Sequence, residues 1–455
     1  MLIRSYIFTL PLLTALVFPG FGQPGILETY IETGLQNNQQ LIREQLDVEI
    51  QREVLREAKG KFLPDIFVDA SYIRADGGRI IAVPAGDLVN PAYAGLNQLF
   101  GSEQFPANIE NVNEQFLPDN FHETKIRLIQ PILNTDIYFN RRIQQSQLSA
   151  REARQKAFEN QLINRIKEAY YNHLSAKEQL AILSATRSIL LELVRVSKSQ
   201  VANDKATKEV IFGAQAELSQ LESEIAGAER QEKVSGIFFN YLIGRDLNDS
   251  ILVEEEEVLE TSQPQRLADL TNTALNQRQE ISEINFGLEA SQSRTLLNKR
   301  YVVPEISLVG DLGFQGFGYE FDDTQDFWFL SVGLTWPIFQ GHQNKARIQQ
   351  AVLQEKQLTS RLKETQDLIA LEVAEAYYAY EEALKTMEAR RAERESAQEN
   401  FRIIEKKYAQ NQVIQVAFNE ARNTYTTAQL QEVITKYKVK IRKAALDAAI
   451  AHQKI

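Results

Sequence analysis

The stretch LINRIKEAYYNHLSAKEQLAIL, residues 162–183, decides the fold class. Its small and apolar side chains recur at alternating spacings of four and three residues, as in the seam along which helices pack in a coiled coil. His173 lies inside this seam, so we interpret it as a packed core residue rather than a metal ligand. Residues 138–202 contain neither proline nor glycine, so one helix can span about 98 Å at about 1.5 Å per residue. The seam consists of Leu162, Ile166, Ala169, His173, Ala176, Leu180 and Leu183.

The same plan occurs twice along the chain. Ala169-Tyr170-Tyr171 recurs as Ala376-Tyr377-Tyr378, and Pro131-Ile132-Leu133 recurs as Pro337-Ile338-Phe339, after shifts of 207 and 206 positions. Leu63-Pro64-Asp65 recurs as Val303-Pro304-Glu305 after 240 positions, so the first copy has extra residues between its prolines. The sequence therefore predicts an internal duplication.

Each long helix is expected to reverse at a short polar turn. The candidate turns are Asn203-Asp204-Lys205 and, in the second copy, Gln410-Asn411-Gln412. Asp and Asn tolerate the left-handed backbone conformation that ends many helices. Each copy is thus predicted to carry a long helical hairpin.

Four stretches of about ten residues alternate between apolar and polar side chains. This length suits a tilted membrane strand, although a half-buried soluble sheet gives the same alternation. Trp328 and Trp336 lie at the two ends of one face and predict membrane-interface anchors, with core tryptophans as the alternative. Four strands cannot close a barrel, and open edges would leave backbone groups unpaired in lipid, so a membrane sheet requires several chains to pool their strands.

These patterns predict the following boundaries. Residues 1–22 read as a signal peptide, because Arg4 precedes an apolar stretch and Gly20-Phe21-Gly22 supplies small residues for cleavage. Residues 75–121 are expected to form a long loop, and residues 245–264 a linker. The first repeat, 23–244, is predicted to contain a helix at 27–62, strands at 65–74 and 122–131, and a hairpin at 138–244. The second repeat, 265–455, is predicted to contain a helix at 265–302, strands at 305–314 and 326–336, and a hairpin at 343–455.

Composition excludes several classes of function. The 455 residues include no cysteine and four histidines, and the net charge is −11. Zinc thiolate sites, iron–sulfur clusters and cysteine nucleophiles are therefore absent, and a broad basic surface for nucleic acid is not expected. No nucleophile-elbow, metalloprotease, phosphate-loop or dinucleotide-binding motif lies in a suitable context. We therefore predict no enzyme, no catalytic residue, no metal and no cofactor.

At this point the landmarks resemble a known family. Over essentially the whole mature chain the sequence is similar to the TolC family of outer-membrane efflux proteins. The opening Leu35-Gln36-Asn37-Asn38 matches only loosely, and the more specific matches combine with the duplication. These are Leu63-Pro64 and Val303-Pro304 before strands, Pro131 and Pro337 after them, Tyr241-Leu242-Ile243-Gly244 closing the first half, and Ala274-Leu275 with Arg278-Gln279-Glu280 opening the second.

The resemblance implies a mainly α fold with membrane β-structure. Long coiled-coil hairpins would form a tunnel across the periplasm of a Gram-negative bacterium, and four strands per chain would build a trimeric 12-stranded β-barrel in the outer membrane. It further implies a homotrimer in contact with outer-membrane lipid, a periplasmic adaptor (membrane fusion) protein and an inner-membrane pump of the proton-driven RND or ATP-driven ABC type. The implied role is a passive exit duct of a tripartite efflux or type I secretion system.

The resemblance also assigns roles to the hairpin tips. Adaptor contacts are implied for Asp204, Lys205, Ala206, Thr207, Asn411, Gln412 and Ile414. Members of the family often close their periplasmic entrance by polar contacts among a tyrosine, an arginine and acids. Here Tyr408 keeps the tyrosine, Val413 stands at the arginine position, and Val210 and Ala417 stand at acidic positions. We therefore expect an apolar latch of Val210, Val413 and Ala417, with Glu420 as an acidic ring in the trimer, or else as an exposed surface glutamate.

A soluble periplasmic coiled-coil adaptor or scaffold is the alternative function. It explains the signal peptide and the long helices. It does not explain four alternating strands at matching places in both copies.

Overall fold

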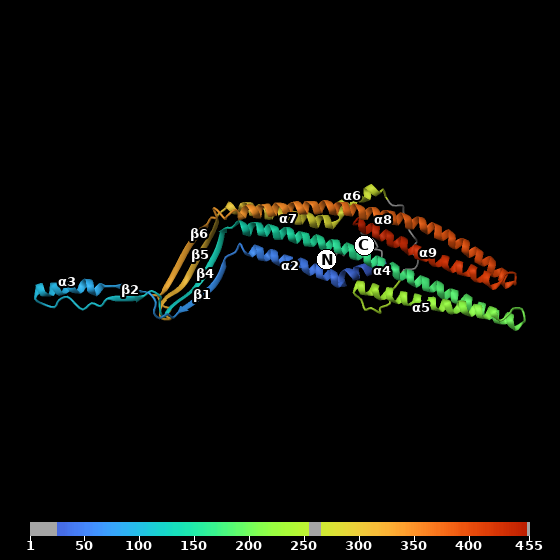
Figure 1. The fold of residues 1–455 in the computed structure, drawn as a ribbon, viewed down its shortest axis with the longest axis horizontal. Helices are drawn as coiled ribbons and strands as arrows, with labels where there is room; N and C mark the ends of the chain where they lie inside the picture. The colour runs from blue at the N-terminus through green and yellow to red at the C-terminus, as the bar shows by residue number, and fades with distance from the viewer. Residues whose placement is uncertain (1–24, 254–264, 453–455) are drawn as a thin grey trace, which may run out of the picture. The chain divides into compact units, whose positions relative to one another are not determined.

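The computed structural model describes residues 25–253 and 265–452 (Figure 1). The predicted signal peptide, residues 254–264 of the predicted linker and the last three residues lie outside this part of the chain. The first repeat has helices α1 (Ile26–Asn37), α2 (Gln39–Gly60), α4 (Thr135–Ala202) and α5 (Glu209–Ile243). The second has α6 (Leu267–Gln277), α7 (Gln279–Lys299), the 3-10 turn η1 (Arg300–Val302), α8 (Gln343–Ala409) and α9 (Gln415–Ala449).

Four strands form one antiparallel sheet with the order β1-β4-β5-β6. They are β1 (Asp65–Ile73), β4 (Phe121–Leu133), β5 (Glu305–Phe317) and β6 (Asp326–Thr335). The two copies therefore meet in the middle of the sheet, where β4 pairs with β5. The outer edges belong to β1 and β6, and no other strand of the described residues pairs with them.

The opening helix of each copy is broken, which corrects the expectation of continuous helices at 27–62 and 265–302. Asn38 takes an extended conformation, and its side-chain oxygen accepts hydrogen bonds from the backbone N–H groups of Gln40 and Leu41, at 3.0 and 3.1 Å. This N-cap begins a new helix at Gln39. Arg278 makes the equivalent break, where its guanidinium contacts Glu280 and Glu372. The breaks lie 240 positions apart, like the prolines that follow these helices.

The connection between β1 and β4 is structured, which corrects the expectation of a plain loop at 75–121. It contains the two-stranded ribbon of β2 (Ile80–Val83) and β3 (Val112–Gln115), with α3 (Ala85–Phe100) between them. Pro91 lies inside α3, and an internal proline argues against a helix when only the sequence is read. The corresponding connection between β5 and β6 contains no helix or strand.

The described chain forms two compact units. Asp47–Ala153 and Ser282–Glu364 make up one unit, which contains the strands, and the remaining described residues make up the other. The unit without strands contains the predicted seam in its core, where Leu162, Ile166 and Ala169 are almost completely buried. Residues 245–253 are attached to this core rather than forming a free linker, since Ile251 and Val253 pack against it.

None of the described helices combines the length and the apolar character that a membrane-spanning helix requires.

Candidate functional site

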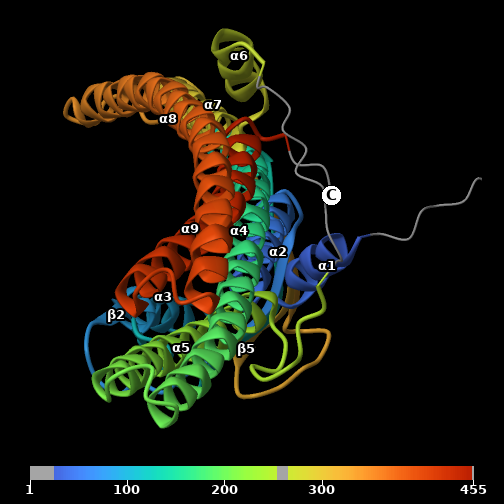
Figure 2. The ribbon, with the colours of Figure 1, turned by 90° about the vertical axis from the view of Figure 1, so that its right-hand side faces the viewer.

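The two hairpin turns have the same backbone geometry. Asp204 and Asn411 both adopt the left-handed conformation, with φ of 55° and 58°. The N–H of the following residue bonds back across the end of the helix in each case, from Lys205 to the carbonyl of Gln200 at 2.8 Å and from Gln412 to Lys407 at 2.9 Å. This pattern satisfies carbonyls at the end of a helix. Both predicted turns thus lie where the sequence placed them (Figure 2).

The predicted adaptor-contact residues are mostly exposed at these turns. Ala206 is half-buried, whereas the other six are open to solvent: Asp204, Lys205, Thr207, Asn411, Gln412 and Ile414. Sequence reasoning missed two neighbouring apolar residues, Phe212 and Val416, whose exposed fractions are 66% and 69%. Each lies on a returning helix, a few residues after a turn. The signal that could have identified them in the sequence is an apolar side chain outside the helical seam.

The predicted entrance residues separate into two groups. Tyr408 packs against Phe418, with 4.9 Å between ring centroids, beside the apolar cluster of the hairpins. Burial raises the pKa of the Tyr408 hydroxyl. Val210, Val413 and Ala417 are half-buried, while Glu420 is exposed.

Polar contacts join the two hairpins to each other. Arg422 on α9 is 3% exposed and donates from Nη2 to Glu217 Oε2 on α5, at 2.6 Å. Burial lowers the pKa of the Arg422 guanidinium, and the charge of Glu217 opposes that shift. Gln200 near the first turn donates to the side-chain oxygen of Asn411 in the second, at 3.1 Å. The sequence did not reveal these pairs, because nothing in the chain indicates which helices of different repeats lie side by side.

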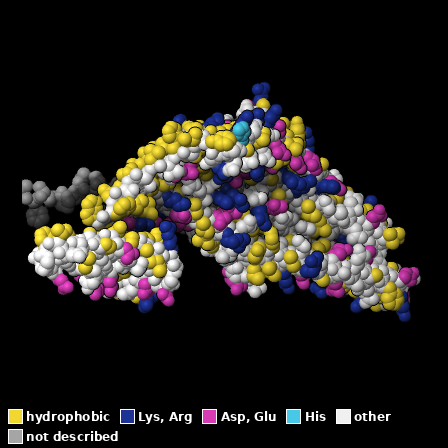
Figure 3. All heavy atoms as spheres, turned by 60° about the vertical axis from the view of Figure 1, so that its left-hand side comes forward, with side chains coloured by type: hydrophobic (Ala, Val, Ile, Leu, Met, Phe, Trp, Pro, Cys, Tyr) yellow, Lys and Arg dark blue, Asp and Glu magenta, His cyan; other side chains and the backbone are white. Residues whose placement is uncertain are grey.

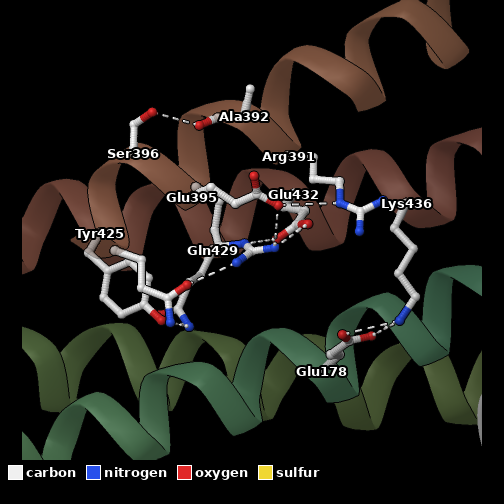
Figure 4. A network of polar contacts seen from close by, with 11 residues as sticks. Glu178, Arg391, Ala392, Glu395, Ser396, Tyr425, Gln429, Glu432 and Lys436 are labelled. Atoms are coloured by element: carbon white, nitrogen blue, oxygen red, sulfur yellow. Dashed lines mark hydrogen bonds and ion pairs between the residues drawn. The ribbon is translucent and has the colours of Figure 1, made fainter. Parts of the chain in front are cut away.

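Further from the turns, α9 remains tied to its neighbours. Lys436 Nζ lies 2.9 Å from Glu178 Oε2 on α4, as Figure 4 shows. Within the second hairpin, Arg394 on α8 donates to Glu432 on α9 at 2.8 Å. Polar contacts therefore join α9 both to α4 and to α8. These hydrogen bonds are charged and partly buried, and such bonds stabilise more than exposed ones.

The sheet has one charged face and one apolar face. On the charged face Arg127 of β4 lies opposite Asp311 of β5, and two hydrogen bonds of 2.8 and 2.7 Å join them. Lys125 lies on the same face and contacts Glu123 at 2.6 Å. The bidentate geometry suits guanidinium and carboxylate groups and holds the two copies in register.

The opposite face exposes a broad set of large apolar side chains. Its register pairs Val68 with Ile126 and Leu312 with Trp328. Trp328 is 77% exposed, and Trp336 donates from its indole nitrogen to the carbonyl of Val302 at 2.9 Å. Hydrophobic side chains gather in a broad band on the face that Figure 3 shows. The apolar face includes Ile66, Val68, Ile126, Leu312, Trp328, Leu330, Val332 and Leu334.

The described residues hold no cluster of histidines and carboxylates that could bind a metal ion. His173 is 4% exposed, and its ring lies against Ser235, 3.2 Å away on α5. The interpretation as a packed core histidine is therefore confirmed.

Comparison with known proteins gives a match of part of the chain to one family model and a fold shared over nearly the whole chain. Residues 270–452 match the family model described as outer membrane efflux protein. None of the curated proteins matches the chain. A membrane protein from Pseudomonas aeruginosa has the same fold, with a TM-score of 0.76, 18% identity and coverage of 94% of both chains.

Two other solved structures agree. The CmeC outer membrane channel of Campylobacter jejuni has a TM-score of 0.76 and 18% identity, over 94% of this chain and 86% of that one. The outer membrane protein VceC of Vibrio cholerae has a TM-score of 0.74 and 16% identity, over 93% of this chain and 95% of that one. The expected mainly α fold with a four-stranded sheet is confirmed, because these outer-membrane proteins share it over nearly the whole chain. Residues 270–452 are thus similar to outer membrane efflux proteins, and the chain shares its fold with outer-membrane channels of known structure.

Proposed function

We propose that this protein is the exit duct of an efflux or secretion system, as a homotrimer in the outer membrane. The observation that supports it best is the sheet, which exposes a broad apolar face and carries charges on the other. The outer edges of β1 and β6 pair with no strand of the described residues. Backbone groups at such edges must be paired in lipid. Three chains would pool twelve strands, with β1 of one chain beside β6 of the next.

The charged face would then line the pore. Arg127 and Asp311 would keep each other compensated inside a water-filled interior, and the apolar face would contact lipid. Trp328 and Trp336 would lie near the two membrane interfaces, where indole rings are favoured.

The helices would continue the duct into the periplasm. Residues 23–244 and 265–455 would act as two repeats of one plan, and α4 alone is long enough for about 100 Å at about 1.5 Å per residue. Transport through the duct would be passive. A proton-driven RND or ATP-driven ABC pump in the inner membrane would supply the energy through an adaptor.

The hairpin turns would form the entrance and the adaptor contact. The exposed polar residues of the two turns and the exposed side chains of Phe212, Ile414 and Val416 make these turns a mixed docking surface. The half-buried Val210 and Val413, with Ala417, fit the proposed apolar latch, and the exposed Glu420 remains available for an acidic ring.

Two measurements test the proposal. Detergent-extracted outer membranes should yield a trimer that conducts ions in a planar bilayer, and deletion of the protein should sensitise cells to exported compounds. Recovery as a monomer in a salt-soluble periplasmic pool would instead favour the adaptor interpretation.

A further inference from the structure

The connection between β1 and β4, residues 74–120, forms an ordered arm. At its base Arg74 Nε donates to Asp119 Oδ1 at 2.8 Å, and the Tyr72 hydroxyl donates to Asn120 Oδ1 at 2.6 Å. Beyond the base, β2 and β3 pair over four residues each. The arm therefore holds its tip on a defined stem rather than on a slack loop.

One face of α3 is fixed to the arm itself. Asn90 bonds both the carbonyl and the N–H of Ile109, at 2.8 and 2.7 Å, and Asn97 does the same with Phe105, at 2.6 and 2.9 Å. Gly86 lies so close that a Cβ there would meet the carbonyl oxygen of Ile109 at 2.1 Å. These contacts set the rotation of α3 about its axis.

The opposite face of α3 is apolar and has no partner among the described residues. The opposite face is formed by Leu88, Ala92, Gly95 and Leu99. Leu88, Ala92 and Leu99 each lie two residues, or about 200° around the helix, after a residue of the fixed face, so they point away from that face. Leu88 and Leu99 are 71% and 84% exposed, and a Cβ on Gly95 would meet no atom within 4 Å. After Asp87 the helix carries no charged residue. Leucines that flank small residues at this spacing form a seam suited to close helix packing.

The chemistry of this seam favours an identical partner. The seam is uncharged, so two identical chains do not repel one another across it. Each chain offers two leucines and two small residues in the same order. In the proposed trimer β1 of every chain lies at one barrel rim and leads directly into its arm, so three arms start from that rim. The inference rests in this respect on the proposed function.

We infer that α3 is an interface between copies of this chain, in which the faces formed by Leu88, Ala92, Gly95 and Leu99 pack against one another. The contact would continue, through the arms, the strand pairing proposed above between the protomers.

Single cysteines provide the test, because the natural chain has none. Ala92→Cys and Ala94→Cys change the same residue type at exposed positions of the same helix, which point about 160° apart. Each variant is oxidised in intact outer membranes and run without reductant. We expect Ala92→Cys to form a two-chain band that reductant removes, and Ala94→Cys to remain a single chain while reacting with a soluble maleimide.

An Ala92→Cys variant that stays a single chain in a confirmed trimer would overturn the inference, whether or not maleimide reaches the thiol. Equal crosslinking of both variants would also overturn it, since it would reflect random collisions of arms. Amine crosslinking of the unmodified protein reports the trimer independently of α3. A protein that is monomeric by that measurement defeats the proposed function, whereas a trimer without the Ala92→Cys band defeats only the α3 interface.

Discussion

The two repeats contain matching helices and strands. They differ in the connection between their two strands and in the side chains with which each hairpin contacts the other. The first repeat joins its strands through the arm with α3, and the second uses residues 318–325 alone. The hairpin turns are alike in backbone, yet the side chains that bind one hairpin to the other come from unmatched positions. Duplication therefore accounts for the scaffold, and the differences mark the places where each copy has a task of its own.

The largest expected effect tests whether the two repeats contribute equally to the proposed membrane sheet. Val68→Arg in β1 and Val332→Arg in β6 each place a charge on the apolar face. We expect a cost of about 2–4 kcal/mol per chain in both cases, because an arginine near the bilayer midplane is poorly solvated. The amount of trimer in outer membranes and its thermal midpoint in detergent measure the effect.

The matched controls are Ser71→Arg and Ser331→Arg on the opposite face of the same strands. Both should assemble nearly as well as the natural protein. If Val332→Arg assembled as well as Ser331→Arg, the assignment of the lipid face would be wrong.

The second test concerns the contact between the hairpins, where the repeats are unequal. Glu217→Gln leaves the buried Arg422 guanidinium without its carboxylate, and we expect a loss of about 1–3 kcal/mol. Arg422→Met removes the buried charge as well and should cost less. Thermal unfolding in detergent gives the stabilities, and single-channel conductance reports whether the entrance loosens.

The first repeat supplies the control for this pair. Gln215 lies 207 positions before Arg422 and is exposed on α5. Gln215→Met should change stability by less than about 0.5 kcal/mol and leave the conductance unaltered. An Arg422→Met variant that is more damaging than Glu217→Gln would contradict the importance of the unpaired charge.

The sequence predicted those parts of the fold that depend on local pattern. The seam around Leu162, the turns at Asp204 and Asn411 and the four strands follow from periodicity and backbone preference. The breaks at Asn38 and Arg278 were missed. Asn38 caps the next helix locally but is also held by the distant carbonyl of Leu242, to which its side chain donates at 2.8 Å, and Arg278 is held by the distant Glu372. The Arg422–Glu217 pair was invisible for the same reason, and α3 was concealed by Pro91.

A third test uses the two turns, which differ in one contact. Asp204→Gly should change stability by less than about 0.5 kcal/mol, because two effects oppose each other. Glycine adopts the left-handed conformation without strain, but it also makes the unfolded chain more flexible. Asn411→Gly also loses the hydrogen bond from Gln200, so we expect it to be less stable by about 0.5–1 kcal/mol. Combining each variant with Gln200→Ala isolates the contact, since only the effect of Asn411→Gly should shrink.

The smallest expected effect distinguishes the repeats by pH. His173 stands where the second repeat has Tyr380, and both side chains are buried. Burial lowers the pKa of the His173 imidazole, and Lys177 adds to this while Glu232 opposes it. Above the ordinary histidine pKa of about 6.5 the ring is neutral in both the folded and the unfolded chain, so it costs nothing there.

Below that pH the unfolded chain binds a proton that the folded chain resists, so stability falls with the pH until the folded pKa is reached. His173→Gln cannot take up this proton and should flatten part of the loss in thermal midpoint between about pH 7 and pH 5. If His173→Gln gave the same pH profile as the natural chain, acid sensitivity would arise from carboxylates common to both repeats, and the buried histidine would not distinguish them.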